Sequence, residues 1–269
     1  MCFVENLTEQ KKIILHIFGL KFTFRPHLKF YFCELMGLFL DFYFFLKRIN
    51  LNKNYKIISL GTYCLPRKIA TVNKLKPTRK KGEKSCPFDL AFSDFDENIE
   101  LISNNFENFF DGLEQNSDGR WVNSRIKMVY NHDDSLSKDE FTERYNARIK
   151  NLYNYFSDKS KHKFILGALQ KPINQEQIKN LQKALEKYMD KNDFDIILIN
   201  QSKEICNYND VNVHIINQHE NFKLWENINK NYLWTAAITK KYLPEALKIY
   251  YEITNSMINI IKKVMKNKT

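Results

Sequence analysis

The chain has 269 residues, of which 43% are hydrophobic and 27% charged, with only 7 Gly and 6 Pro. This composition excludes a collagen-like or broadly disordered chain and predicts a globular protein with a buried core. The net charge of +11 favours an anionic partner, but composition alone does not identify an activity.

The positive charge is concentrated in one segment. Residues 47–84 hold twelve Lys and Arg against a single acid, Glu83, whereas residues 85–119 hold nine acids and no Lys or Arg. Two interpretations stay open: the two blocks pair with each other, or the basic block meets an anionic membrane surface or a phosphorylated substrate. We expect no nucleic acid partner, because no nucleic-acid-binding motif accompanies the charge.

The N-terminal 49 residues predict an appendage. Residues 12–25 are typical of two short strands that form a hairpin around Gly19. Residues 28–48 then predict an aromatic-rich apolar helix that is too short, and too interrupted by acids, to span a membrane. Either it lies at a membrane interface, flanked by Lys29 and Lys47-Arg48, or it is buried against the main domain. Residues 50–54 are the expected linker.

From residue 55 to 269 the pattern predicts one α/β domain with an open, mostly parallel sheet of about five strands and flanking helices. The candidate strands are 56–60, 126–130, 163–168, 194–199 and 211–216. The candidate helices are 65–75, 96–110, 137–157, 174–191 and 243–265. Ser137 with Glu140, and Asn174 with Gln177, have the spacing of capping boxes. Pro66 and Pro244 suit first-turn positions.

The five cysteines are an odd number with irregular spacing and no CxxC pair, which favours reduced thiols in a cytoplasmic protein. The N-terminus lacks the basic and apolar regions of a signal peptide. We therefore expect a cytoplasmic protein that is peripheral at the inner membrane if the apolar helix meets lipid.

Cys64 is the leading candidate nucleophile. The segment Ile57–Leu60 predicts a strand that breaks at Gly61, and a helix follows near Pro66, so Cys64 falls at a helix N-terminus. The positive end of the helix dipole, with Arg67 and Lys68 nearby, favours a thiolate there. The alternative is a buried, inert thiol that fills the turn.

His132 is the candidate proton carrier for this cysteine. It follows strand 126–130, and if that strand runs parallel to 56–60, both residues emerge at the same edge of the sheet. Either Asp133 or Asp89 could orient the imidazole. Among the other histidines, His162 is expected in a solvated loop and His214 in the core. A capping or structural role for His132 also stays open.

Further side chains are candidates for binding the substrate. Arg67 and Lys68 follow Cys64, and Arg144 and Arg148 lie four apart on one helix face, where they can clamp a carboxylate or phosphate, or pair with nearby acids. Trp225 and Trp234 are candidates for a sugar-stacking surface or for ordinary packing. The sequence shows no dinucleotide-binding or Walker-type glycine loop and no metal-ligand spacing, so we expect neither cofactor nor metal.

A family resemblance joins these segments. SLGTYC, CPFDLAFSD with the downstream NFENFFD, VYNHDD and FTERYNARIKNLYNYF together resemble the bacterial family of putative papain-like cysteine peptidases, a domain of unknown function, over about residues 55–240. The resemblance implies a dyad of Cys64 and His132 with Asp89 close by. It also implies an acyl-transfer or hydrolytic activity, in which the substrate is an anionic small molecule, a glycan or an acyl compound.

Other functional interpretations of the sequence stay open. Members of that family look like companions of cell-surface polysaccharide genes, and IFGLKF resembles leaders of envelope glycosyltransferases, so a role in polysaccharide biosynthesis is an expectation. By analogy, a strand ending in Gly before a nucleophile also looks like the first block of a GDS-type esterase. The competing class is a non-catalytic, membrane-peripheral binding or assembly module of an envelope-glycan pathway.

Overall fold

The computed structural model describes residues 2–7, 12–17, 20–24, 29–49, 51, 54–202, 204–218 and 239–268. Side-chain surroundings are described from residue 39 onwards within these ranges, except at 72, 79 and 239–250. The chain divides into two compact units, Lys53–His219 and the combination of Met1–Asn52 with Glu220–Thr269. The C-terminal segment therefore groups with the N-terminal one, whereas the sequence-based boundary assigned it to the α/β domain.

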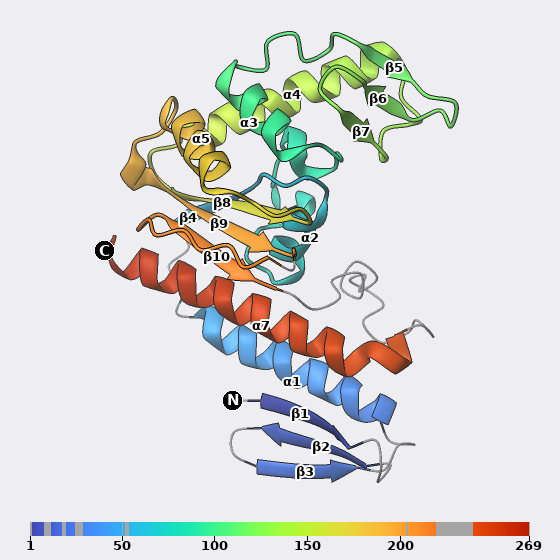
Figure 1. Cartoon of the computed structure of the whole chain (residues 1–269), viewed down its shortest axis with the longest axis vertical. Coiled ribbons are helices and arrows are strands. Elements are labelled where there is room, and N and C mark those ends of the chain that lie inside the picture. Colours follow the sequence, from blue (N-terminus) through green and yellow to red (C-terminus); the bar gives the residue numbers. More distant parts are fainter. Residues whose placement is uncertain are drawn as a thin grey trace. The chain divides into compact units, whose positions relative to one another are not determined.

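The unit formed by Met1–Asn52 and Glu220–Thr269 contains an antiparallel sheet and two long helices (Figure 1). The sheet comprises β1 (Cys2–Leu7), β2 (Lys12–Ile17) and β3 (Leu20–Phe24), and the pairing of β2 with β3 confirms the predicted hairpin. Helix α1 (Lys29–Ile49) packs on α7 (Thr239–Lys266), where Lys47 Nζ donates to Asn255 Oδ1 at 2.5 Å. Helix α7 begins five residues before Pro244 and not at it.

One face of α1 is apolar and exposed. Its members share spacings of three and four residues and are each about half exposed: Phe39, Phe42, Phe45, Leu46 and Ile49. No helix in the described ranges has the combination of length and apolarity that crossing a bilayer requires.

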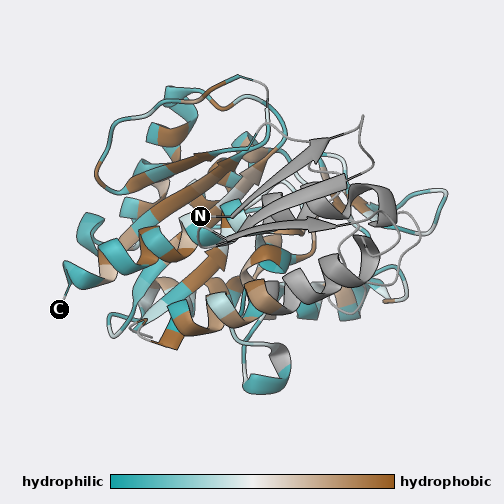
Figure 2. Cartoon of the chain, turned by 90° about the horizontal axis from the view of Figure 1, so that it is seen from below, coloured by the Kyte–Doolittle hydropathy of each residue, from teal (hydrophilic) through white to brown (hydrophobic). Residues whose placement is uncertain are grey.

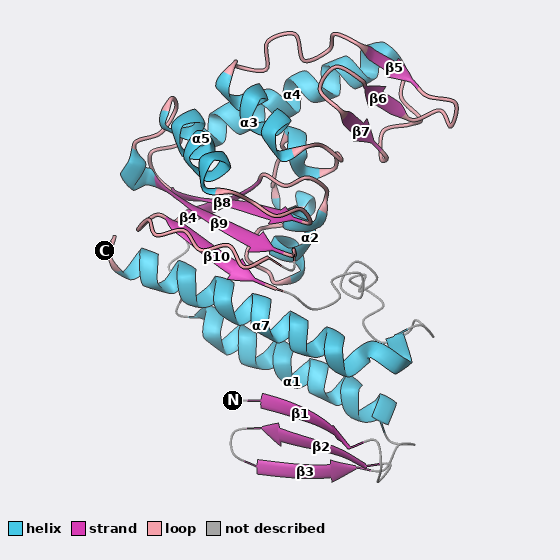
Figure 3. Ribbon diagram, in the orientation of Figure 1, coloured by secondary structure: helices cyan, strands magenta, loops and turns pink. Residues whose placement is uncertain are grey.

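The unit Lys53–His219 is built on a four-stranded sheet in the order β10-β9-β8-β4, with every neighbouring pair parallel (Figure 3). The strands are β4 (Tyr55–Ser59), β8 (His162–Leu169), β9 (Phe194–Asn200) and β10 (Val213–Asn217). Strands β8 and β9 are buried along their whole length, as expected of mostly apolar strands covered on both faces. Figure 2 shows strands that are largely hydrophobic (brown), with hydrophilic helix faces (teal) outside them. The predicted α/β class with a parallel sheet is confirmed.

One predicted strand of this sheet was wrong. Residues 126–130 contribute β7 (Met128–Tyr130), which belongs to a separate antiparallel sheet with β5 (Leu113–Gln115) and β6 (Trp121–Asn123). A short apolar run has the same pattern in either kind of sheet, so its partner is not determined by periodicity. The ring of Phe141 packs against Trp121 and Tyr130, which joins this small sheet to the helix that follows it.

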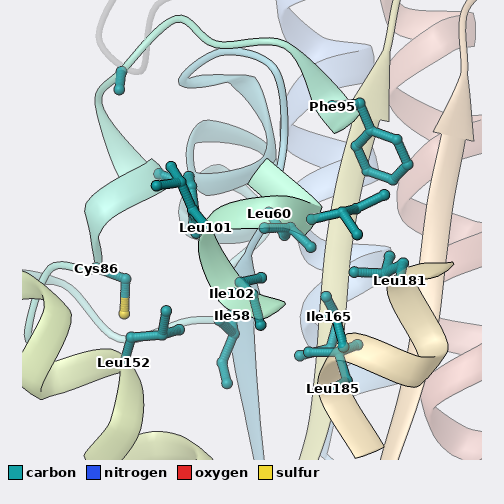
Figure 4. Close-up of a cluster of buried hydrophobic side chains, with 14 of the residues drawn as sticks. Ile58, Leu60, Cys86, Phe95, Leu101, Ile102, Leu152, Ile165, Leu181 and Leu185 are labelled. Atoms are coloured by element: carbon teal, nitrogen blue, oxygen red, sulfur yellow. The ribbon is translucent and has the colours of Figure 1, made fainter. Parts of the chain in front are cut away.

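Helices cover the parallel sheet and complete the core (Figure 4). They are α2 (Leu65–Val72), α3 (Phe95–Ser103), α4 (Lys138–Ser157) and α5 (Gln175–Glu186), with short 3₁₀ turns η3 (Arg79–Lys81), η4 (Pro87–Asp89) and η5 (Lys191–Asp193). Both predicted capping boxes are present, which confirms where α4 and α5 begin. Ile58 and Ile165 of the sheet lie in one buried cluster with Ile102 of α3 and Leu185 of α5.

Candidate functional site

Cys64 occupies the N-cap of α2, immediately after the loop that follows β4, as the sequence predicted. Its thiol is not in a disulfide and is partly exposed. Pro66 stands in the first turn and has no N–H, so the N–H groups of Leu65 and Arg67 are the first-turn donors without an intrahelical acceptor. A sulfur at this end of a helix lies in the positive part of the helix dipole, where a thiolate is favoured over a thiol.

The two residues before Cys64 line a cavity. Thr62 and Tyr63 border a volume of about 430 Å³ together with Leu169 at the end of β8 and Phe92 from the loop before α3. The rings of Tyr63 and Phe92 stack with centroids 6.2 Å apart, and Phe92 is 40% exposed. Ligands of open parallel sheets bind beyond the carboxyl ends of the strands, and this cavity, termed the strand-end groove below, has that position.

The charges around the strand-end groove are paired with one another. Lys171 Nζ contacts Asp94 Oδ2 at 3.1 Å, and Lys127 Nζ contacts Glu97 Oε1 at 2.6 Å. The amide of Gln177 donates to Asp96 at 2.9 Å. Both lysines that line the groove are paired with acids, and the walls include Val129, Leu169 and Ile173. The groove therefore suits an uncharged, partly apolar group.

His132 is exposed and follows β7 by two residues. Its link to Cys64 differs from the predicted one, because β7 is not in the parallel sheet. Phe92 and Val129 exchange two backbone hydrogen bonds of 2.8 Å, and the Ser93 N–H donates to the carbonyl of Thr62 at 2.9 Å. The segments that carry Cys64 and His132 are thus both bonded to residues 92–93. An approach of the sulfur to the imidazole stays a prediction.

Asp133, the residue after this histidine, is buried and fully engaged. Its carboxylate accepts from Arg144 at 2.6 Å, from Arg148 at 2.9 Å and from the Tyr145 hydroxyl at 3.0 Å. Burial by itself raises the pKa of Asp133, but hydrogen bonds from Arg148 and Arg144 outweigh it and leave the pKa below its ordinary value. The two arginines therefore pair with a nearby acid, one of the two roles that the sequence left open.

Asp89 joins η4 to α2. It is fully buried, and its Oδ2 accepts from Arg67 Nη1 and from the backbone N–H of Cys86, both at 2.8 Å. Lys76 Nζ lies 3.6 Å from the other oxygen. Arg67 is in the first turn of α2, so this ion pair fixes the start of the helix that follows Cys64. Lys68, the next residue, donates its backbone N–H to the carbonyl of Cys64 at 3.2 Å.

The basic and acidic blocks face each other only in part. Arg67 and Lys76 of the basic block pair with Asp89 of the acidic block. The other ion pairs that the structure gives for the acidic block use Lys171, Lys127 and Arg125, which lie outside the basic block. Several basic side chains consequently remain exposed: Lys74, Lys80, Lys81 and Lys84.

A cluster that sequence reasoning missed lies at the start of the parallel strands. Asp195 Oδ2 is 2.7 Å from His162 Nε2, and Asp195 Oδ1 is 2.7 Å from His214 Nε2. The expected solvated loop at His162 was wrong, since that residue begins β8 and is buried. His214 has the hydrogen-bond partner expected of it, Asp195, but it is only partly buried and does not lie in the core. Within the described part of the chain, no group of three His, Cys, Asp or Glu residues is placed to hold a metal ion.

Because of this cluster, we expect the free energy of unfolding to decrease at acid pH. Burial alone raises the pKa of Asp195, but hydrogen bonds from His162 and His214 outweigh it, so the folded-state pKa lies below 3.8. The stabilisation is therefore complete above the unfolded-state pKa and is lost as pH falls through the folded-state value. We expect the difference in unfolding free energy between wild type and Asp195→Asn to shrink below pH ~4. Urea denaturation at pH 5 and pH 3 measures it, and a constant difference would contradict this account.

Two further cysteines and the two candidate tryptophans complete the set of residues considered from the sequence. Cys86 and Cys206 are buried, and burial raises the pKa of both thiols, so we expect both to react more slowly than Cys64. The tryptophans proposed for sugar stacking, Trp225 and Trp234, lie outside the described residues.

Comparison with known proteins gives one match. Residues 55–204 match the model of a family described as "putative papain-like cysteine peptidase". No curated protein and no solved structure matches the chain. The matched range contains Cys64, Asp89 and His132, together with the whole strand-end groove.

Proposed function

The chain belongs to the family of putative papain-like cysteine peptidases, and from this premise we propose that it is a thiol enzyme that hydrolyses or transfers an acyl group. Cys64 is the nucleophile and His132 the proton carrier. The observation that supports this most is the position of Cys64 at the N-terminus of α2, directly after two residues that line the strand-end groove.

The proposed first step forms an acyl-enzyme. The Cys64 thiolate attacks the carbonyl carbon of the substrate, and the developing oxyanion accepts hydrogen bonds from first-turn N–H groups of α2. The carbon then releases its leaving group, which takes a proton from His132. In the second step water attacks the thioester while His132 accepts its proton, and the thiolate is regenerated with release of the acid. An alcohol or amine in place of water gives transfer instead of hydrolysis.

The strand-end groove is proposed to hold the acyl side of the substrate. Its apolar walls and paired charges favour a neutral group, and the exposed ring of Phe92 offers a flat surface against which that group can pack. Asp133 and Asp89 act as positioning residues, because the first fixes the turn that carries His132 and the second fixes the start of α2 through Arg67.

Trapping the acyl-enzyme tests this function. Wild-type protein is treated with p-nitrophenyl acetate, quenched in acid and mapped by mass spectrometry of its peptides. We expect an acetyl group on Cys64, no such adduct in Cys64→Ala, and an unchanged adduct in the matched control Cys206→Ala. Acetylation that is confined to other residues, or ester hydrolysis that is equal in wild type and Cys64→Ala, would refute the proposal.

The exposed face of α1 favours a second candidate function, docking on an anionic membrane surface. Five large apolar side chains lie on this face, and Lys47 and Arg48 end the same helix. We expect full-length protein to float with vesicles that contain phosphatidylserine, and Phe42→Ser to float less. The control Ile205→Ser, at an exposed apolar position of the other unit, should float like wild type. Equal flotation of all three proteins would exclude this face as the lipid contact.

A further inference from the structure

A second cavity of about 430 Å³ lies between α4 and the loop that precedes η4. Helix α4 contributes Arg144, Arg148 and Asn151, and the loop contributes Lys84 and Ser85. We call it the arginine pocket. It shares no lining residue with the strand-end groove, so it is a separate site.

The arginines of this pocket are held in place by a buried acid. Asp133 accepts from Nη1 of Arg144 and from both Nη1 and Nη2 of Arg148, and the Arg148 guanidinium also lies over the Tyr145 ring at 4.4 Å. A guanidinium has five N–H donors, and Asp133 takes at most two from either arginine. Most donors of both groups are therefore left for another acceptor, on side chains whose conformations are already fixed.

The acids near the pocket do not cancel its positive charge. Asp133 is met by two arginines, and Glu83, on the pocket wall, is met by Lys76 at 3.4 Å and by Lys56 at 3.6 Å. Lys76 is shared with Asp89, which also pairs with Arg67, and Glu140 interacts with Arg144. With the exposed ammonium of Lys84, six cations face four acids: Lys56, Arg67, Lys76, Lys84, Arg144 and Arg148 against Glu83, Asp89, Asp133 and Glu140. The pocket keeps an excess of positive charge, in contrast to the strand-end groove, where the lysines are paired with acids.

Neutral donors complete the lining. The hydroxyl oxygen of Ser85 accepts from Arg67 Nη1 at 2.8 Å, which leaves the hydroxyl proton free to be donated. The Asn151 amide donates to the Ser85 carbonyl at 3.1 Å and holds the loop against α4. Because Arg67 reaches Ser85 from the first turn of α2, one side chain connects the wall of the pocket to the helix that begins after Cys64.

From this arrangement we infer that the arginine pocket binds the phosphoryl group of a small phosphorylated molecule. Guanidinium groups match phosphate oxygens in geometry, and a phosphate monoester carries about −1.5 to −2 charges at neutral pH. Arg144, Arg148 and Lys84 carry more positive charge than Asp133 neutralises. A phosphate monoester matches this excess more closely than a carboxylate, which carries a single negative charge. The volume of the pocket exceeds that of phosphate itself, so an organic part of the ligand fits beside it. Use of this pocket to anchor the substrate of Cys64 rests on the proposed function, whereas binding itself does not.

Calorimetric titration of full-length protein with phenyl phosphate, at constant ionic strength, tests the inference. Wild type is expected to bind, with benzoate at least tenfold weaker, and Lys84→Ala is expected to bind about tenfold more weakly than wild type because a charge-assisted contact is lost. The matched control Lys81→Ala removes an exposed lysine outside the pocket lining and should bind like wild type. Lys84 makes no side-chain bond to Asp133, so its loss leaves the arginines in place.

The outcomes separate this inference from the enzyme proposal. Binding that persists in Cys64→Ala supports the pocket even if no acyl-enzyme forms. Benzoate that binds as tightly as phenyl phosphate would overturn the choice of phosphate. No binding by wild type, or equal weakening in Lys84→Ala and Lys81→Ala, would overturn the pocket as a phosphate site.

Discussion

His132→Ala is expected to slow ester hydrolysis about 10²- to 10⁴-fold, the range that a positioned general acid or base contributes. The imidazole is exposed, so its removal should leave the free energy of unfolding within about 0.5 kcal/mol of wild type. Steady-state hydrolysis of p-nitrophenyl acetate, with urea denaturation of the same samples, measures both effects.

A neighbouring position provides the control for this variant. Asp134 is also exposed and lies two residues further along the same turn, so Asp134→Ala changes the local surface and charge without removing a proton carrier. We expect it to hydrolyse the ester at close to the wild-type rate. If His132→Ala and Asp134→Ala are equally active, His132 is not the proton carrier.

Asp133→Ala is expected to destabilise the protein by about 3–5 kcal/mol, because it leaves Arg148 buried without its counter-ion. The Arg148 side chain is 8% exposed, and the Tyr145 hydroxyl loses its acceptor at the same time. Asp133→Asn keeps an acceptor oxygen and should lose less. Urea denaturation at pH 7 measures the changes. A loss below about 1 kcal/mol in Asp133→Ala, the scale of an exposed ion pair, would show that this pair does not hold α4 to the turn before it.

The sequence predicted those parts of the fold that depend on local patterns. Ser137 with Glu140 and Asn174 with Gln177 fixed the starts of two helices, because a capping box acts over three residues. Cys64 was placed correctly at the N-terminus of α2, because the end of β4 and Pro66 bracket the turn within a few residues.

Pairings between distant segments were not predictable in the same way. The run Ile126–Tyr130 has the same apolar character in a parallel or an antiparallel sheet. A tight turn, in which Lys127 has a φ of 48°, brings β7 back alongside β6. His162 looked solvated because its neighbours are lysines, but its burial depends on Asp195, 33 residues away. The packing of α7 on α1 likewise joins the two ends of the chain.

In the candidate site, too, local sequence indicated some residues and contacts between distant segments determine others. Cys64 and His132 stood out by residue type and position, whereas Tyr63 and Phe92 gain their importance from a ring contact across the strand-end groove. Sequence reasoning did not single out either ring, although both lie in segments that carried the family resemblance, SLGTYC and CPFDLAFSD. The arginine pocket depends on Lys84 and Arg148 being brought together by the fold, which neither spacing nor composition reveals.

The most direct test of the account is the rate at which iodoacetamide alkylates Cys64 between pH 5 and pH 9, followed by peptide mass spectrometry. We expect this rate to reach its plateau at a lower pH than the rate for free cysteine, and we expect His132→Ala to move the plateau toward the free-cysteine value. A profile that coincides with free cysteine in both proteins would contradict an activated thiolate at the start of α2.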